Sequence, residues 1–166
     1  MTKAFDSLHP PVMLNKLRAY CFAEITVNLL RSYLSNRKNR IRLGSLTSSW
    51  QVVNRGSPQG SALGPLLWNI FQNDLAYEIN LNLSMYADDH QIYEVGRDLA
   101  NVKSSLSRNA EKVSKWYEDN MLKGNYIKYK TVAMQNKGEK TNPTMSIQGS
   151  EIESTEKLNL LRSDDS

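Results

Sequence analysis

Apolar residues recur at intervals of three and four positions in four stretches of the chain. This spacing places one apolar face on a helix, and it predicts helices over residues 11–21, 25–34, 62–76 and 98–122. Pro10 and Pro11 support the start of the first helix, because proline suits a first helical turn. Gly124 and Asn125 are expected to end the fourth helix, since glycine commonly follows the last helical turn.

Shorter apolar runs predict strands between and after these helices. Two runs flank a turn at Gly44 and Ser45, and two more flank Asp88 and Asp89. The expected strands cover residues 41–43, 50–53, 83–87, 91–94, 131–134 and 145–148. The remaining segments are expected to be a basic turn at 35–40, a polar loop at 136–144 and a disordered tail at 151–166.

Composition narrows the class of protein only moderately. The chain has 166 residues, of which 40% are hydrophobic and 23% charged, so it suits one globular domain or part of a larger one. A net charge of +4 permits a nucleic-acid partner, but proteins that bind no polyanion also carry such a charge. The single cysteine, Cys21, excludes a disulfide within the chain and fits a reducing compartment.

The sequence contains no stretch of 18 uncharged apolar residues, so no transmembrane helix or membrane partner is expected. The N-terminus lacks a basic segment followed by an apolar core, so it does not resemble a secretory signal. These features predict an intracellular protein, with nucleus and cytoplasm both open.

Two adjacent carboxylates, Asp88 and Asp89, stand at the expected tip of a hairpin. Their like charges repel each other, and a nearby cation would relieve this repulsion. Mg²⁺ takes oxygen ligands and is typically held by one or two carboxylates together with substrate phosphates. The alternative is ordinary turn chemistry on a solvated loop, where aspartate is frequent. The apolar flanking strands favour a rigidly held tip.

A second candidate is the segment RGSPQGSALGP at residues 55–65, which leads directly into an expected helix. Glycine lets a backbone come close to a ligand, and a helix N-terminus favours anions. The segment therefore suits a loop that lies against a nucleotide or a base pair. A tight connection before a helix, with no ligand, explains the same residues.

Taken together, these segments resemble the reverse transcriptase family. RGSPQGSALGPLLWNIFQNDL at 55–75 is similar to motif B, and YADD at 86–89 is similar to motif C, in the order and separation typical of the family. KAFDSLHPPVMLNKL at 3–17 looks like the end of motif A in LINE-type (non-LTR) retrotransposons. KWYEDNMLKGNYIKYKTVAM at 115–134 looks like their motif D.

The resemblance implies an RNA-directed DNA polymerase that uses an RNA template, a DNA primer and a dNTP. Two Mg²⁺ ions would stabilise the attacking and leaving oxygens. Asp88 would be the principal metal ligand, supported by Asp89. The residues that the resemblance assigns to nucleotide or template binding are Phe5, Pro58, Gln59, Gly60, Tyr86 and Lys130.

Several of these assignments have an alternative interpretation. Phe5 matches the aromatic gate that favours deoxynucleotides, and it suits a core position equally well. Lys130 competes with Lys128 for a place near the phosphates, and both suit a solvated face. A set of basic side chains suits either a nucleic-acid backbone or simple solubility: Lys16, Arg18, Arg37, Lys38, Arg40 and Arg42.

The fold class expected from the resemblance is α/β (α+β), an incomplete polymerase palm with helices on one face of an antiparallel sheet. That sheet would carry the YADD hairpin and a strand ending near Lys3. Residues 1–135 would form the partial palm, from the end of motif A through motif D. Residues 136–166 would hold a polar loop, the start of the primer-grip region and a disordered tail.

The chain also departs from the family. The first motif A aspartate would lie five residues before Phe5, at the position preceding Met1, and Asp6 lies beyond the gate aromatic. Arg162 stands where the primer grip usually has glycine, and the fingers and thumb are missing from the sequence. We therefore expect little or no polymerase activity from this chain, with a non-catalytic nucleic-acid-binding remnant or a functionless relic as alternatives.

Overall fold

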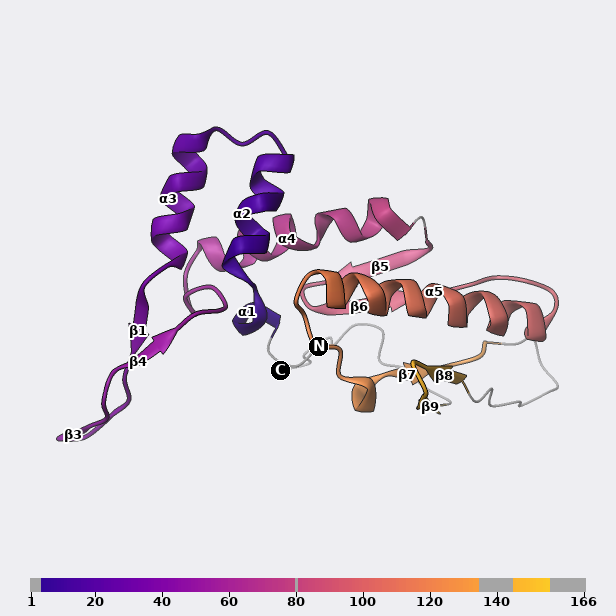
Figure 1. The fold of residues 1–166 in the computed structure, drawn as a ribbon. Coiled ribbons are helices and arrows are strands. Elements are labelled where there is room, and N and C mark those ends of the chain that lie inside the picture. Colours follow the sequence, from indigo (N-terminus) through magenta and orange to yellow (C-terminus); the bar gives the residue numbers. More distant parts are fainter. Residues whose placement is uncertain (1–3, 80, 135–144, 156–166) are drawn as a thin grey trace.

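The computed structural model describes residues 4–79, 81–134 and 145–155 (Figure 1). The expected strand end at Lys3, the polar loop at 136–144 and the primer-grip segment at 157–166 lie outside these residues. The helices are α1 (Ala4–Ser7), α2 (Pro10–Ala19), α3 (Glu24–Leu34), α4 (Leu63–Ile79), α5 (Leu99–Asp119) and the 3₁₀ turn η1 (Tyr126–Lys128). The strands are β1 (Arg37–Asn39), β2 (Arg42–Leu43), β3 (Leu46–Thr47), β4 (Gln51–Val53), β5 (Leu83–Tyr86), β6 (Asp89–Ile92), β7 (Lys130–Thr131), β8 (Met145–Ile147) and β9 (Ser150–Ser154).

The four helices predicted from apolar spacing are confirmed as α2, α3, α4 and α5. Asp98 caps α5, because its carboxylate accepts hydrogen bonds from the backbone N–H groups of Ala100 and Asn101 at 3.4 and 3.2 Å. The helix ends at Asp119, a few residues before the expected end, where Asn120 donates its side-chain amide to the carbonyl of Trp116. The expected α/β class is confirmed by this mixture of helices and small sheets.

The strands differ more from expectation. The basic segment expected as a turn at 35–40 contains β1, which pairs antiparallel with β4, so that prediction was wrong. The turn at Gly44 and Ser45 is confirmed, but it joins β2 to β3. Strand β1 forms because its partner β4 is rich in β-branched residues, and cross-strand pairing overrides the turn propensity of the basic run.

The end of the described chain is also more ordered than expected. The tail expected from residue 151 onward begins with β9, which pairs antiparallel with β8 and parallel with β7. Its buried Ile152 packs with Met145 and Ile147 of β8 against Ala110 of α5, so this part of the tail prediction was wrong. Strand β7 covers Lys130 and Thr131, so it shares only Thr131 with the expected strand at 131–134.

The main core extends across four helices, in which α3 packs on α2, α2 on α4 and α4 on α5. Its fully buried members include Trp68, Phe71 and Leu75, all on α4. Within this core, the Lys16 ammonium of α2 pairs with the Asp74 carboxylate of α4, and Trp116 of α5 donates its indole N–H to the same carboxylate at 3.2 Å. One charged pair thus joins three helices.

Candidate functional site

The two acidic residues stand at a tight hairpin turn between β5 and β6. Tyr86 pairs with Asp89 across the hairpin, which leaves Ala87 and Asp88 as its two-residue turn. Asp88 is half-buried, while Asp89 is exposed as the first residue of β6. Tyr86, assigned to nucleotide or template binding, is 72% exposed. The prediction of an acidic hairpin tip is confirmed, although Asp89 belongs to the strand.

A buried tryptophan fixes this turn to the core. The indole N–H of Trp68 donates to the carbonyl of Ala87 at 2.8 Å, and the Trp68 side chain is fully buried. The ring centroid of Phe5 lies 5.7 Å from that of Trp68. Trp68 therefore connects α1, α4 and the acidic turn. Sequence reasoning missed this role, because the spacing of Trp68 within an apolar helix indicates only a core position.

The glycine-rich loop is tied to the same N-terminal segment. The backbone N–H of Gly56 donates to the carbonyl of Leu8 at 2.7 Å, and that of Ser57 donates to the carbonyl of Phe5 at 2.9 Å. Gly56 has a φ of +76°, and a Cβ atom there would stand 2.7 Å from the Cα atom of Asp6. Glycine is required at this position both for its conformation and for this close approach.

The outer part of the loop is open to solvent. Pro58 is half-buried, whereas Gln59 and Gly60 are exposed. The Gln59 side-chain amide donates to both carboxylate oxygens of Asp6, at 3.0 and 3.3 Å. A Cβ atom at Gly60 would meet no atom within 4 Å, so a ligand can approach this backbone freely. The loop and α1 thus form one surface beside the acidic turn, with Phe5 beneath it.

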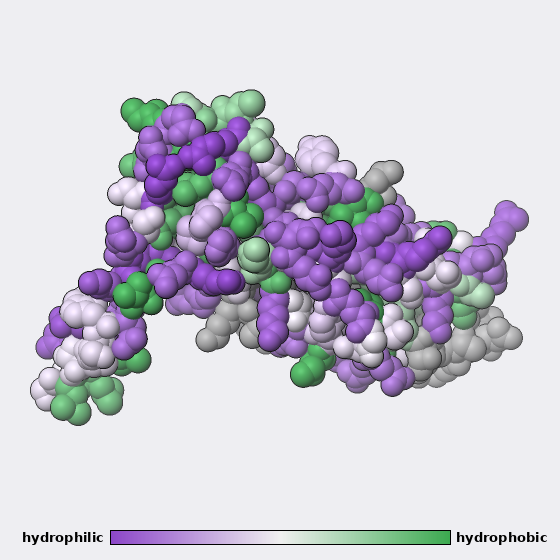
Figure 2. Space-filling view, in the orientation of Figure 1, coloured by the Kyte–Doolittle hydropathy of each residue, from purple (hydrophilic) through white to green (hydrophobic). Residues whose placement is uncertain are grey.

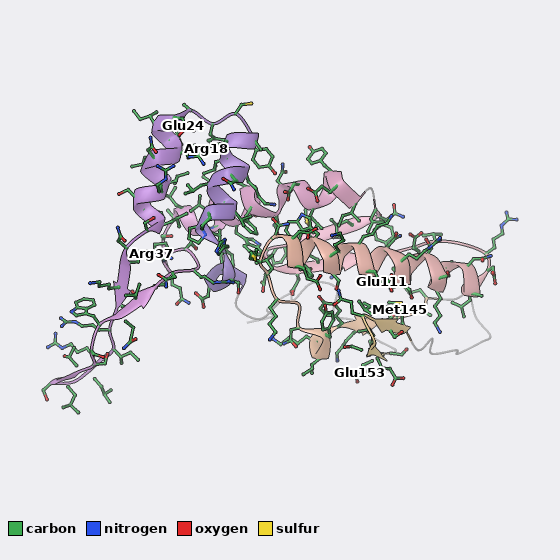
Figure 3. The ribbon with its side chains drawn as sticks, viewed as in Figure 1. Arg18, Glu24, Arg37, Glu111, Met145 and Glu153 are labelled. Atoms are coloured by element: carbon green, nitrogen blue, oxygen red, sulfur yellow. The ribbon has the colours of Figure 1, made fainter. Side chains whose placement is uncertain are left out.

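Two arginines hold the start of this loop. The Arg37 guanidinium donates to the carbonyls of Arg55 and Gly56 at 2.7 and 2.5 Å, and its Nε atom donates to the carbonyl of Leu34 at 3.2 Å. Arg55 donates to the carbonyl of Met121 beyond α5 at 3.1 Å. Arg37 lies at the junction of α3 and β1 (Figure 3). Arg37 therefore joins the end of α3 to the start of the glycine-rich loop.

Behind the acidic turn, His90 is held in a polar network. Its Nδ1 atom lies 2.7 Å from the Tyr117 hydroxyl and its Nε2 atom lies 2.9 Å from the Gln72 side-chain oxygen. Because that amide oxygen can only accept, Nε2 carries the proton and Nδ1 accepts from Tyr117. Burial lowers the pKa of His90 to about 4, although the charge of the Asp88 carboxylate favours a higher pKa. Burial also raises the pKa of the Tyr117 hydroxyl.

Lys130 lies apart from these residues. It is exposed on β7, and its ammonium forms an ion pair with Glu153 of β9 at 3.7 Å, across the parallel strand pair. Its competitor Lys128 is exposed in η1. Among the residues that the structure describes, neither lysine forms an ion pair with Asp88 or Asp89. Of the predicted residues, the structure brings together Phe5, the loop and the turn, and Lys130 is separate.

The donor set at the turn suits part of a magnesium site. Within the described ranges, no three histidine, cysteine, aspartate or glutamate side chains gather into one metal-binding group. Asp88 and Asp89 nevertheless supply hard oxygen ligands at an accessible turn, which is the protein contribution that Mg²⁺ needs when substrate phosphates and water complete its shell. The two carboxylates therefore fit a cation that is shared with a substrate.

Two other sequence expectations concern Cys21 and the membrane. Cys21 is exposed with a free thiol and a φ of +59°, so it follows α2 and does not lie on it as expected. Among the described helices, none combines the length and the apolar character needed to cross a bilayer.

Known proteins resemble this chain over most of its length. Residues 1–155 match the family described as reverse transcriptase (RNA-dependent DNA polymerase). A probable RNA-directed DNA polymerase from transposon BS of Drosophila melanogaster is 35% identical over 97 residues, which are 54% of this chain and 11% of the relative. The RNA-directed DNA polymerase from mobile element jockey of the same species is 24% identical over 81% of this chain and 16% of the relative.

A third relative is the putative 115 kDa protein in type-1 retrotransposable element R1DM, also from Drosophila melanogaster. It is 31% identical over 68% of this chain and 11% of its own length. The chain therefore spans only a small part of these curated relatives. The family match covers the acidic turn, the glycine-rich loop and the segment around Phe5, and it confirms the resemblance drawn from the motifs. The chain belongs to the reverse transcriptase family.

Proposed function

We propose that this chain forms part of the nucleotide-transfer site of a retrotransposon RNA-directed DNA polymerase. Its partners would be an RNA template, a DNA primer and a dNTP. The observation that carries the proposal is the convergence of three distant segments on Trp68 and Gly56. The acidic turn and Phe5 are both in contact with Trp68, and the glycine-rich loop is bonded to the segment around Phe5 through Gly56 and Ser57.

Each of these parts has a role in the proposal. Asp88 and Asp89 would hold Mg²⁺, which when bound stabilises the attacking and leaving oxygens of nucleotidyl transfer. Gln59 and Gly60 offer an exposed amide and an open backbone to the incoming nucleotide and the template base. Phe5 would limit the space beside the sugar, because its ring is fixed against Trp68. The protein thus mainly positions its partners, as phosphoryl transfer requires.

We propose further that the 166-residue polypeptide alone has little polymerase activity. Two carboxylates on one turn can hold one side of a two-metal site, and no third carboxylate joins them among the described residues. Loss of a metal-bridging ligand costs several kcal/mol of transition-state stabilisation, a factor of about 10³ or more in rate. Extension of a DNA primer on an RNA template at ordinary polymerase rates would refute this part of the proposal.

The metal site can be tested without any polymerase activity. Mn²⁺ replaces Mg²⁺ at such oxygen sites, and its binding to the chain in the presence of dNTP can be followed by electron paramagnetic resonance. We expect Asp88→Asn to weaken Mn²⁺ binding at least ten-fold. The matched control is Glu111→Gln, which removes an exposed carboxylate from α5. Equal Mn²⁺ affinity in the two variants would contradict the proposed metal site.

The alternative function is nucleic-acid binding without chemistry. It is favoured by one observation, the concentration of basic side chains before the glycine-rich loop. Salt-dependent binding of a primer–template by a chain that extends no primer would support it.

A further inference from the structure

A two-stranded arm projects from the helical body between α3 and the glycine-rich loop. It comprises residues 37–53, with the β1–β4 pair at its base and the β2–β3 pair at its tip (Figure 1). Two residues (40–41) lie between β1 and β2, and three (48–50) lie between β3 and β4. This unequal number indicates a bulge that bends the arm between its two strand pairs. Ser48 secures the bend, since its hydroxyl accepts from the backbone N–H of Ile41 at 2.9 Å.

The side chains of this arm are open to solvent. Figure 2 shows apolar and polar residues mixed along its length and apolar ones gathered at its end. Trp50 is 57% exposed and Leu43 is 77% exposed. Isolated two-stranded hairpins are marginally stable in water, so an arm that buries so little side-chain surface is suited to gaining contacts from a partner. The other exposed apolar residues are Ile41, Leu46 and Val52.

The charge of the arm identifies the chemistry of that partner. Between Glu24 and Asp74 the chain has no acidic residue and six basic ones, which are Arg31, Arg37, Lys38, Arg40, Arg42 and Arg55. Four of the six lie in residues 37–42. In the described part of the chain, no carboxylate pairs with Lys38, Arg40 or Arg42. A one-sign cationic surface complements a polyanion such as a phosphate backbone.

Trp50 adds a stacking surface to these charges. The Arg40 guanidinium lies over one face of its ring, 4.5 Å from the ring centroid. Lys38, Arg40 and Trp50 all line the same shallow hollow on the arm. Alternating cationic and aromatic groups along a groove are the means by which proteins bind single-stranded nucleic acid, through phosphate contacts and base stacking.

The base of the arm is joined rigidly to the candidate site. Arg37 is fixed at the base by its three hydrogen bonds to backbone carbonyls, two of them in the glycine-rich loop. Strand β4 ends at Val53, only five residues before Pro58. A strand held on the arm therefore leads toward the exposed loop at Gln59 and Gly60.

We infer that the arm binds single-stranded nucleic acid, with bases stacked on Trp50 and phosphates held by Lys38, Arg40 and Arg42. Apolar side chains at the tip flank the bases. The inference rests on the proposed function for the choice of a nucleic acid, but its site is separate from the acidic turn and needs no metal. A duplex would offer the Trp50 ring no unstacked base, so single strands are the preferred ligand.

Fluorescence gives a direct measurement of this contact. The three tryptophans are Trp50, Trp68 and Trp116, and the last two are buried, so a ligand on the arm quenches Trp50 alone. The 166-residue chain is titrated in EDTA with 20-nucleotide oligo(dT) and oligo(U), and a labelled oligo(dT) reports affinity by fluorescence anisotropy. The comparison of the two oligomers distinguishes DNA from RNA as the preferred strand.

Two variants of the arm and one matched control define the expected result. Trp50→Ala should weaken binding about ten-fold, since stacking contributes about 1–3 kcal/mol per base. Lys38→Ala combined with Arg42→Ala should lower the slope of log affinity against log salt by about 1.4, since each phosphate contact on a single strand contributes about 0.7. The control is Arg108→Ala combined with Lys112→Ala, two exposed cations on α5.

Several outcomes would overturn the inference. One is an equal loss of salt dependence in the α5 control, which would indicate binding by net charge alone. Another is unchanged affinity in Trp50→Ala with no quenching. A third is self-association that is insensitive to salt and lost in Trp50→Ala, which would make the arm an interface between copies of the chain. Asp88→Asn should bind the oligomers with unchanged affinity. Evidence against the proposed metal site would therefore not affect the conclusion about the arm.

Discussion

The buried state of His90 predicts a pH dependence of stability. The folded protein keeps this imidazole neutral between Tyr117 and Gln72, with a pKa of about 4. In the unfolded chain the pKa returns to its ordinary value of about 6.5. Because the folded-state pKa is depressed, stability is full above pH 6.5 and falls as the pH falls toward 4.

The size of the effect follows from the two pKa values. The unfolded chain takes up one more proton than the folded chain over this range, which corresponds to at most about 3 kcal/mol. Between about pH 8 and pH 5 the expected loss in the free energy of unfolding is about 2 kcal/mol. Ordinary carboxylates stay largely ionised down to pH 5, so they contribute little to that difference.

Urea unfolding followed by circular dichroism at several pH values measures this loss. The comparison variant is His90→Gln, whose amide cannot titrate. The wild type should lose about 2 kcal/mol more than His90→Gln between about pH 8 and pH 5. The second histidine, His9, also has a lowered pKa, first from burial and then from Arg55, but it remains in both proteins and cancels. Parallel curves for the two proteins would refute the reasoning.

Three further changes have definite expected outcomes. Ala87→Gly should raise the free energy of unfolding by roughly 0.5–1 kcal/mol in a urea titration, because Ala87 has a φ of +51°; a loss of stability would contradict this. Gly56→Ala should lower it by about 2–4 kcal/mol, since the new methyl group would collide with the backbone of Asp6. Lys16→Met should cost about 3 kcal/mol by leaving the Asp74 carboxylate partly buried without its cation. Adding Asp74→Asn should recover most of that loss, and a double-mutant cycle with simple additivity would exclude the coupling.

The sequence predicted those features that depend on local spacing. Helices α2, α3, α4 and α5 followed from apolar residues at three and four positions, because each helix buries one face in a common core. The acidic turn followed from two apolar runs around Asp88 and Asp89. Both kinds of pattern are set by neighbouring residues, so a single sequence is sufficient to find them.

Features that depend on distant contacts were not predictable in this way. Strand β1 contains Arg37 and Lys38 in a run typical of turns, and it becomes a strand only because β4 pairs with it. Strand β9 lies in a polar segment, and it is ordered by burying Ile152 beneath α5. The hydrogen bond from Trp68 to Ala87 could not be predicted. In the sequence, a tryptophan that supports a site has the same spacing as one that only fills the core.

The candidate site therefore depends on packing as much as on its carboxylates. Helix α4 fixes the acidic turn at two points, since Trp68 bonds to Ala87 in the turn and Gln72 bonds to His90 just after it. The glycine-rich loop is fixed through Gly56, at a backbone approach that any side chain would prevent. Movement of α4 would consequently shift the turn, the loop and Phe5 together. Helix α4 thus links the parts of the candidate site, although the described sheets are small and separate.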